Sequence, residues 1–411
     1  MKLFRDIFIL AAAVVVGFSV IVFNAGALLT NGPSDEKAYS SLEARYLTDF
    51  PSATPESMLS GELQDALDGF LADHIPARNE TVLANAALQR ASIALSAACL
   101  GFDVYPTFFG SNYYAIPNDG ILSGRAEEAP ADGGGPALDA WVNTLNEAAR
   151  NHPDVHFIYD CVVRHDQCEW NPTYRFYDNR LNASWVEEHM ISRLDPHIDA
   201  FIDAVQSYDE VKTEWFPNDG HWTLKRALDS HNRIAERLNL PKYDFENPVK
   251  VCDAWYGDYA RSGSDLDVAS TLYDLPLDFS RITFYNLDDL FGWEKTMGMR
   301  DSVLAGEAEL PSHGFSMYYE YHGGASAETW NSGESNGKTL LFVGDSLVYC
   351  LERYLAADYQ HAVFLLPGNA TYEESLEAYI QRYDPDDIII MTHASKYQTI
   401  ADCSPAFVGL E

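Results

Sequence analysis

Basic residues are scarce in this chain of 411 residues. Lysine and arginine together number 27, against 62 aspartates and glutamates, so the formal net charge at neutral pH is −35. A surface with so few cations does not complement the phosphates of DNA or RNA over a broad area, and nucleic acid is excluded as a partner. The acidic surplus favours a well-solvated surface and says little about chemistry.

Closely spaced metal ligands are also missing. None of the six cysteines belongs to a C-x-x-C pair, and the twelve histidines form no H-E-x-x-H motif. A metal site therefore has no support from the sequence, and we expect neither a metal nor a cofactor. Cys161 and Cys168 are near enough to close one loop, but their spacing leaves open whether they form a disulfide.

The N-terminus holds a long apolar run. From Ile7 to Leu29 only two side chains are polar, and Lys2 and Arg5 precede the run. About twenty apolar residues cross a bilayer as a helix, and flanking positive residues stay in the cytoplasm. We expect residues 1–30 to form a single-pass membrane anchor, with the bulk of the chain extracytoplasmic. A cleaved signal peptide, which would leave a secreted protein, is the competing interpretation.

Composition divides the remainder into a linker and one domain. Residues 31–56 are rich in proline, serine and acidic residues without a regular period, which is typical of an extracytoplasmic linker. The chain as a whole is 47% hydrophobic, enough for a sizeable core, and in residues 57–411 helical patterns alternate with short apolar runs. The segment 185–205 is predicted to be mostly helical. Residues 242–335 lack a clear period and are interpreted as an irregular insertion.

The C-terminal part of the chain predicts a parallel sheet. Apolar runs at 340–343, 362–366 and 387–391 are predicted strands, and helical patterns at 347–355 and 373–383 connect them. Right-handed crossovers would place these strands side by side. We expect an α/β fold with helices flanking a parallel sheet, whose carboxyl edge carries the functional site.

Ser346 follows the first of these strands, in the sequence Gly344-Asp345-Ser346. A serine hydroxyl becomes a nucleophile when a histidine removes its proton and a carboxylate orients that histidine. At the start of a helix, the backbone N–H of Ser346 would also help to stabilise an oxyanion. By itself, however, this tripeptide fits a capped strand-to-helix turn better than a catalytic site.

Asp219 and His221 supply the other two chemical groups. They lie just before a predicted helix, and a carboxylate two residues before an imidazole can orient it locally. The same spacing recurs nearby, at 195–197 and at 229–231, so spacing alone does not single out this pair. The adjoining Trp222 and the position before a helix favour it.

Four segments together resemble the DHHW family of SGNH-like proteins, which is related to the alginate O-acetyltransferases. In chain order they are EARYLTDFPS with LSGELQDALDGFLADHIPAR (within 43–78), NDGHWT (218–223), WYGDYARSG (255–263) and LLFVGDSLVYCLERYL (340–355). Their combination and order carry the resemblance, whereas no single segment is specific. For the fold, the resemblance implies an SGNH-hydrolase-like, flavodoxin-like sheet flanked by helices.

For the site, the resemblance implies that Ser346 is the nucleophile, His221 the general base and Asp219 its orienting carboxylate. An ordinary SGNH esterase carries a D-x-x-H block near its C-terminus, and this chain has none. His393 is therefore expected to be structural. The family name specifies a histidine where this chain has Gly220, a position at which related acetyltransferases vary.

Further residues are expected to support the site. By analogy with SGNH enzymes, Gly368 and Asn369 would complete an oxyanion hole, although a glycine-containing turn explains them equally well. Gly344 and Asp345 would shape the turn of the nucleophile. Trp222 would either line the site or pack beneath it.

The activity that the resemblance implies is O-acetylation of a cell-surface or secreted polysaccharide through an acyl-serine intermediate. Its partners would be the polysaccharide acceptor and an acetyl donor, with a membrane-bound O-acyltransferase passing acetyl groups outward. Two alternatives stay open at this point. One is an SGNH-type carbohydrate esterase, which uses the same residues with water as acceptor, and the other is an inactive glycan-binding or assembly protein.

Overall fold

The computed structural model describes residues 39–40, 45–52, 54–74, 78–108, 110–125, 127–176, 180–263, 267–287 and 326–410. The predicted membrane anchor, residues 1–30, lies outside the described residues, as do part of the linker and residues 288–325 of the predicted insertion. The chain divides into two compact units, Met1–Ser92 and Ile93–Glu411, which are described separately.

The first unit is built from short strands and helices. Its elements are β1 (Tyr39–Ser40), β2 (Arg45–Tyr46), α2 (Pro55–Ser60), α3 (Glu62–Asp73) and the first part of α4 (Arg78–Leu100). Gly61 separates α2 from α3, because its φ of 90° is left-handed. The Asp73 carboxylate accepts hydrogen bonds from the N–H and hydroxyl of Thr48, at 2.8 and 2.9 Å, and so ties the end of α3 to the preceding segment.

Helix α4 connects the two units in sequence. Among the described residues it contains one stretch, Glu80–Leu100, that is long and apolar enough to cross a membrane. Length and composition alone are weak support for such a role, because core helices of soluble proteins pass the same test.

The second unit contains a seven-stranded sheet in the order β10-β11-β13-β12-β14-β6-β7. In chain order the strands are β6 (His156–Val163), β7 (Ile198–Ala204), β10 (Ile282–Asn286), β11 (Ala327–Asn331), β12 (Thr339–Gly344), β13 (His361–Leu365) and β14 (Asp387–His393). The predicted parallel pairing of the strands at 340–343, 362–366 and 387–391 is correct, and β6 and β7 extend the parallel part of the sheet. The expectation of a wholly parallel sheet is wrong at β11, which is antiparallel to both of its neighbours. Only residues 332–338 separate β11 from β12, which is too short for the crossover that parallel strands require.

The five parallel strands have a flavodoxin-like order with a shifted starting point. If counting starts at β12, the spatial order of β12, β13, β14, β6 and β7 is 2-1-3-4-5, as in doubly wound folds. In this chain, however, the strand that comes first in sequence is β6, which is the fourth strand in that count. The segment that follows β7 therefore precedes β12 in sequence, which explains why the histidine motif comes before the serine motif.

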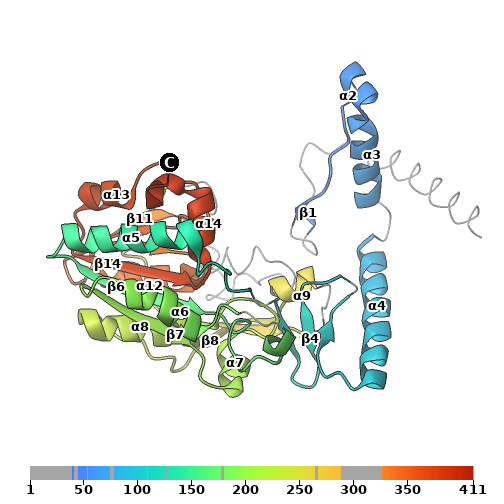
Figure 1. The fold of residues 1–411 in the computed structure, drawn as a ribbon, viewed down its shortest axis with the longest axis horizontal. Coiled ribbons are helices and arrows are strands. Elements are labelled where there is room, and N and C mark those ends of the chain that lie inside the picture. The colour runs from blue at the N-terminus through green and yellow to red at the C-terminus, as the bar shows by residue number, and fades with distance from the viewer. Residues whose placement is uncertain are drawn as a thin grey trace, which may run out of the picture. The chain divides into compact units, whose positions relative to one another are not determined.

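Side chains alternate between the two faces of the sheet. On β12, Leu340 and Phe342 belong to the core on one face, and Leu341 and Val343 to the core on the other. The first face is covered by α8 (Leu224–Leu238), η3 (Ser346–Cys350) and α12 (Glu352–Asp358). The second is covered by α5 (Gly135–Asn151), α6 (Ala183–His189), α13 (Leu376–Tyr383) and α14 (Lys396–Cys403) (Figure 1). Burial on both faces accounts for the continuous apolar run that marked this strand.

The segment predicted to be mostly helical at 185–205 is in part a strand. Helix α6 is followed by the 3-10 turn η2 (Ile191–Arg193), and β7 then pairs in parallel with β6. The sequence of β7 alternates aliphatic residues with aspartate and phenylalanine, which is the period of two of a strand. Because this short stretch directly follows a helical pattern, the sequence alone predicts a helix over the whole segment.

Smaller elements complete the second unit. A three-stranded sheet consists of β3 (Tyr105–Pro106), β4 (Tyr114–Ile116) and β5 (Ile121–Ser123), and a two-stranded one of β8 (Val249–Trp255) and β9 (Ser270–Asp274). The remaining helices are η1 (Pro172–Phe176), α7 (Tyr208–Glu214), α9 (Asp258–Ser262) and η4 (Pro405–Val408). All six cysteines are free thiols, so Cys161 and Cys168 do not form a disulfide.

Candidate active site

Ser346, His221 and Asp219 form one chain of hydrogen bonds. His221 Nε2 lies 2.9 Å from Ser346 Oγ, and His221 Nδ1 lies 2.5 Å from Asp219 Oδ1. An ionised carboxylate only accepts hydrogen bonds, so Nδ1 carries the imidazole proton and Nε2 accepts from the serine hydroxyl. This is the tautomer in which a histidine can remove a proton from a nucleophile.

The turn that carries Ser346 is fixed by Asp345. Ser346 is the first residue of η3, directly after the carboxyl end of β12, and Asp345 caps the turn by accepting from the Leu347 N–H at 2.9 Å. The second carboxylate oxygen accepts from the His393 N–H at 2.7 Å, which binds the turn to the end of β14. At Gly344 a Cβ would lie 2.4 Å from the Phe342 ring, so the strand can end here only with a glycine.

Trp222 packs beneath the site and links its two halves. The indole is fully buried, and its Nε1 donates to the Leu347 carbonyl at 2.9 Å. The sequence left open whether this residue lines the site or lies under it. Trp222 directly follows His221, and Leu347 directly follows Ser346. This hydrogen bond therefore holds the loop that carries His221 close to the turn that carries Ser346.

The third of the family-like segments holds Asp219 in place. Its second carboxylate oxygen, Oδ2, accepts from the Asp258 backbone N–H at 2.6 Å. The Asn218 side chain donates to the Trp255 carbonyl at 2.9 Å, so both residues of the loop are bound to the same segment. Sequence reasoning did not single out Asp258, although Gly257 directly before it is a residue that permits such a close approach of two backbones.

Electrostatics keep Asp219 ionised. Burial alone would raise the pKa of this carboxyl, but the charge of His221 and hydrogen bonds from His221 and the Asp258 N–H hold the pKa below its usual value. Burial and the nearby Asp219 charge raise the pKa of Asp258. Asp219 is therefore a carboxylate throughout the neutral range, as the assigned tautomer of His221 requires.

Gly368 and Asn369 form a turn after β13, and Lys396 holds it. The Lys396 ammonium donates to the Asn369 Oδ1 at 2.7 Å and to the Gly368 carbonyl at 3.2 Å. The Asn369 amide nitrogen donates to the Tyr349 hydroxyl at 2.6 Å, and Tyr349 lies in η3 with Ser346. Through Asn369, the turn with both residues predicted for an oxyanion hole is thus connected to the turn that carries Ser346. No sequence pattern pointed to Lys396.

The other histidines near acidic residues have different surroundings. His197 makes a similar contact with Asp195, at 2.8 Å, but its side chain is 62% exposed. His231 pairs with Asp358 at 2.8 Å inside the core. Burial lowers the pKa of His393 to about 4, so this imidazole is neutral at physiological pH. Among the described residues, no group of three or more His, Cys, Asp or Glu side chains is placed to hold a metal ion.

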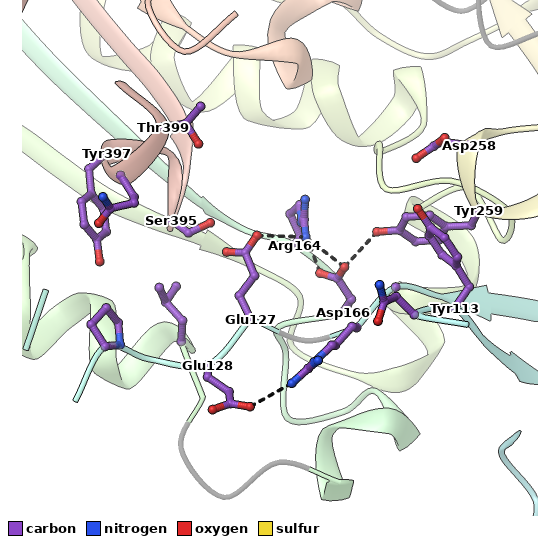
Figure 2. A pocket seen from close by; sticks show the side chains of 16 residues that line it. Tyr113, Glu127, Glu128, Arg164, Asp166, Asp258, Tyr259, Ser395, Tyr397 and Thr399 are labelled. Atoms are coloured by element: carbon purple, nitrogen blue, oxygen red, sulfur yellow. Dashed lines mark hydrogen bonds and ion pairs between the residues drawn. The ribbon is translucent and has the colours of Figure 1, made fainter. Parts of the chain in front are cut away.

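A cavity of about 840 Å³ opens beside Asp258, whose backbone N–H binds Asp219. Figure 2 shows Tyr113 and Tyr259 at one side of this cleft and Ser395 with Tyr397 at the other, with Arg164 and Asp166 between them. The volume suits a small molecule or a few sugar units. Asp258, whose N–H binds Asp219, also lines the cleft, so the cavity adjoins the hydrogen-bonded triad.

Structural comparison identifies proteins of similar fold. A DHHW family protein from Eubacterium siraeum matches with a TM-score of 0.53 and 13% identity, over 71% of this chain and 95% of its own. PatB1 from Bacillus cereus has a TM-score of 0.49 and 14% identity, over 68% of this chain and 95% of its own. The O-acetyltransferase domain of Pseudomonas putida AlgJ has a TM-score of 0.33 and 12% identity, over 68% of this chain and 90% of its own.

At the level of sequence, no family model and no curated protein matches this chain. The likeness to the Eubacterium siraeum protein is a likeness of fold, because an identity of 13% is too low to carry an activity from one protein to the other. The resemblance inferred from four sequence segments and the structural likeness nevertheless lead to the same family fold. What the site does has to be argued from its geometry.

Proposed function

We propose that this protein is a serine O-acyltransferase that acetylates hydroxyl groups of an extracytoplasmic polysaccharide. The observation that carries the proposal is the hydrogen-bonded series from Ser346 through His221 to Asp219. Support comes from the tautomer that Asp219 imposes and from three of the four family-like segments, 218–223, 255–263 and 340–355, which supply the residues of this site. The fold, shared with a DHHW family protein, is compatible with this activity.

The first half of the reaction acylates the serine. His221 Nε2 takes the proton of the Ser346 hydroxyl as Oγ attacks the carbonyl carbon of the acetyl donor. The tetrahedral intermediate collapses, the bond to the donor oxygen breaks, and the leaving group receives the proton from His221. Asp219 stabilises the imidazolium that exists between these two transfers.

The second half of the reaction transfers the acetyl group. A sugar hydroxyl gives its proton to His221 and attacks the acyl-serine carbonyl, and the new ester leaves as Ser346 recovers the proton. The candidate donors to the oxyanion are the Ser346 N–H and the Asn369 side chain, which Lys396 and Tyr349 hold in position. If water takes the place of the sugar, the same residues make the protein an esterase.

The test of this proposal is to trap the acyl-enzyme. Purified full-length protein is mixed with an activated acetyl ester, quenched in acid and analysed by mass spectrometry. We expect one added acetyl group on Ser346, and none in Ser346→Ala. Ser395→Ala, which removes a hydroxyl of the same cleft outside the triad, is the matched control and should be acetylated normally.

Partition of the acetyl group then distinguishes transferase from esterase. With an oligosaccharide acceptor present, a transferase gives acetylated sugar at the expense of free acetate, whereas an esterase gives acetate regardless of the acceptor. An intact Ser346→Ala protein that is still acetylated in the cleft would contradict the proposed nucleophile. An inactive binding protein would give no acyl-enzyme at all.

The proposal includes a location and partners. We place the protein at the outer face of the cell membrane, anchored by residues 1–30, because positive residues precede the apolar run and acidic ones follow it. Its partners would be the polysaccharide acceptor and a membrane-bound O-acyltransferase that supplies acetyl groups. Both partners follow from the family resemblance and are tested by reconstitution.

A further inference from the structure

Residues that line the cleft are connected by hydrogen bonds to Asp219 and to the turn that carries Ser346. On the side of the base, Asp258 lines the cleft and its N–H binds Asp219. On the side of the nucleophile, the lining residue Ser395 contacts His393, whose own N–H binds Asp345. The cleft is thus joined to both parts of the site through these neighbours, while Ser346, His221 and Asp219 themselves are not among its lining residues. The inference below rests on the proposed function.

The lining of the cleft is acidic. Four of its residues are carboxylic acids, Glu127, Glu128, Asp166 and Asp258, and two are arginines, Arg125 and Arg164. None of the lining residues is a lysine or a histidine. The cleft therefore holds two more carboxyl groups than guanidinium groups, in a protein that is already strongly acidic.

Both guanidinium groups are engaged with these acids. Arg164 donates to both carboxylate oxygens of Asp166, at 3.2 and 3.1 Å, and lies 3.6 Å from Glu127. Arg125 donates to Glu128 at 3.2 Å. Figure 2 shows the dashed lines that join Arg164 to Asp166 and Glu127. A sugar carboxylate entering here would have to displace an existing partner from an arginine and would still face the other acids.

The ion pair of Arg164 with Asp166 keeps both of its charges. Asp166 also accepts from the Tyr259 hydroxyl at 2.8 Å. Although burial alone would raise the pKa of Asp166, the adjacent Arg164 charge holds the pKa below its usual value. Asp166 therefore stays ionised and keeps Arg164 occupied.

The same surface suits sugars that carry no negative charge. Carboxylates are hydrogen-bond acceptors only, and sugar hydroxyls are donors that match them. Tyr113 and Tyr397 offer aromatic rings on opposite sides of the cleft, and such rings pack against the apolar faces of sugar rings (Figure 2). Glu127 and Glu128 are 38% and 60% exposed and remain accessible to a ligand.

We propose that this cleft is the acceptor site and that it selects a glycan segment without anionic groups, excluding uronic acid polymers. The selection arises from the two surplus carboxyl groups and from arginines already committed to intramolecular pairs. Uncharged sugars are not repelled by the lining, and amine-bearing sugars are in addition attracted by the surplus carboxyl groups when the amine is protonated.

The experiment measures binding, not turnover. Full-length Ser346→Ala protein, which keeps the cleft but cannot be acylated, is titrated with three β-linked tetrasaccharides of equal length. These are an uncharged glucose tetramer, a glucosamine tetramer with free amines, and a glucuronate tetramer. Binding is followed by calorimetry or NMR. We expect the uronate tetramer to bind at least about tenfold more weakly than the uncharged one, and the difference to shrink at high salt.

A pair of matched variants separates the cleft from the overall charge. Glu128→Gln removes one negative charge and breaks the ion pair of Glu128 with Arg125. This variant is expected to improve uronate binding by about five- to tenfold. Glu236→Gln removes the same charge from an exposed pair with Lys242 that does not line the cleft. It should leave the preference unchanged. An equal effect of the two variants would mean that only the net charge of the protein matters, and would overturn the proposal.

Two further outcomes would also overturn it. One is uronate binding as tight as that of the uncharged tetramer, and the other is no binding of any tetramer. Failure here is distinguishable from failure of the proposed function, because acylation of Ser346 by an activated ester needs no acceptor. A protein that forms the acyl-serine but binds the uronate best would keep the proposed chemistry and lose this assignment.

Discussion

Gly257 lies directly against Asp219. A Cβ at position 257 would stand 2.4 Å from the Asp219 Cβ and 2.6 Å from the Asn218 carbonyl oxygen. Only a glycine allows the start of α9 to come close enough for the Asp258 N–H to reach the carboxylate. This contact, made by residues far apart in sequence, decides where the third member of the triad is held.

The first prediction follows from that contact. In Gly257→Ala the new methyl group forces the backbone away from Asp219, which loses its Asp258 hydrogen bond. We expect kcat for acyl transfer to fall by about 10²-fold, because misplacement of a catalytic group by about 1 Å has effects of this size. Gly69→Ala is the control: its Cβ would meet only Thr48 at an ordinary 3.5 Å, and activity should not change. Equal activity of the two variants would contradict the supporting role of Gly257.

The second prediction concerns the triad itself. Asp219→Asn should lower the rate of Ser346 acylation by about 10³- to 10⁴-fold, since an amide can hold the imidazole in the wrong tautomer. Combining it with His221→Ala should add little, because the residues act as one unit. Single-turnover acylation by an activated ester measures both effects.

The control for this series is another pair of the same sequence spacing. Asp195→Asn alters the exposed contact with His197 and should leave acylation at the wild-type rate. Thermal unfolding of every variant shows whether the fold is kept. Additive losses in the double variant would mean that Asp219 and His221 act independently.

The third prediction assigns a positioning role to Lys396. In Lys396→Met the Asn369 side-chain oxygen loses the ammonium that donates to it, while the amide nitrogen keeps its bond to Tyr349. We therefore expect kcat to fall about tenfold with KM nearly unchanged. Asn369→Ala should show a defect of the same kind. If Lys396 acts through Asn369, the double variant is no worse than Asn369→Ala alone. If the losses of kcat in the two single variants simply add in the double variant, Lys396 does not act through Asn369.

The fourth prediction links stability to pH. Burial, together with the nearby charge of Asp203, raises the pKa of Asp160 to about 8. The folded state therefore retains a proton that the unfolded state releases near pH 4, and stability should decline as pH rises from about 4 to about 8. The decline from this one group is at most about 1.4 kcal/mol per pH unit.

Asp160→Asn tests this dependence. The amide oxygen can still accept from Ser230, which donates to Asp160 in the wild type, but it does not ionise. Urea unfolding at pH 5 and at pH 8 should show the variant gaining stability relative to the wild type as the pH rises. A constant difference between the two proteins would refute the raised pKa.

The fifth prediction concerns topology. If residues 1–30 anchor the chain with its positive end in the cytoplasm, protease added to intact cells reaches the folded part of the protein. Immunoblotting against a C-terminal tag measures the loss. Protection until the membrane is permeabilised would reverse the topology, and a tagged protein found only in the medium would indicate cleavage of the N-terminal segment.

Much of the fold was predictable because local patterns agree with it. The strands β12, β13 and β14 are apolar runs of the expected length, and the helices between them follow the expected period. The strand β7 was missed, since its alternation stands next to a helical pattern. The antiparallel β11 was missed because pairing direction depends on the length of a connection within an irregular region.

Local sequence patterns do not identify which Asp-x-His pair belongs to the candidate site. Four D-x-H pairs have the same sequence spacing, at 154–156, 195–197, 219–221 and 229–231. Two of them make nearly the same contact, at 2.5 Å for Asp219 with His221 and 2.8 Å for Asp195 with His197. A local hydrogen bond between residues two apart forms wherever the turn permits it. Only the approach of Ser346 from a distant part of the chain distinguishes the pair of Asp219 and His221.

The sequence by itself determined which side chains are available, that a serine follows a strand, and that a carboxylate precedes a histidine by two residues. These are properties of short segments, and short segments control capping, periodicity and local hydrogen bonds. The tertiary structure decided that His221 faces Ser346, that Gly257 brings Asp258 to Asp219, and that Lys396 holds Asn369. Each of these contacts joins segments separated along the chain, and their approach depends on how the whole sheet and its helices pack, which no local pattern encodes.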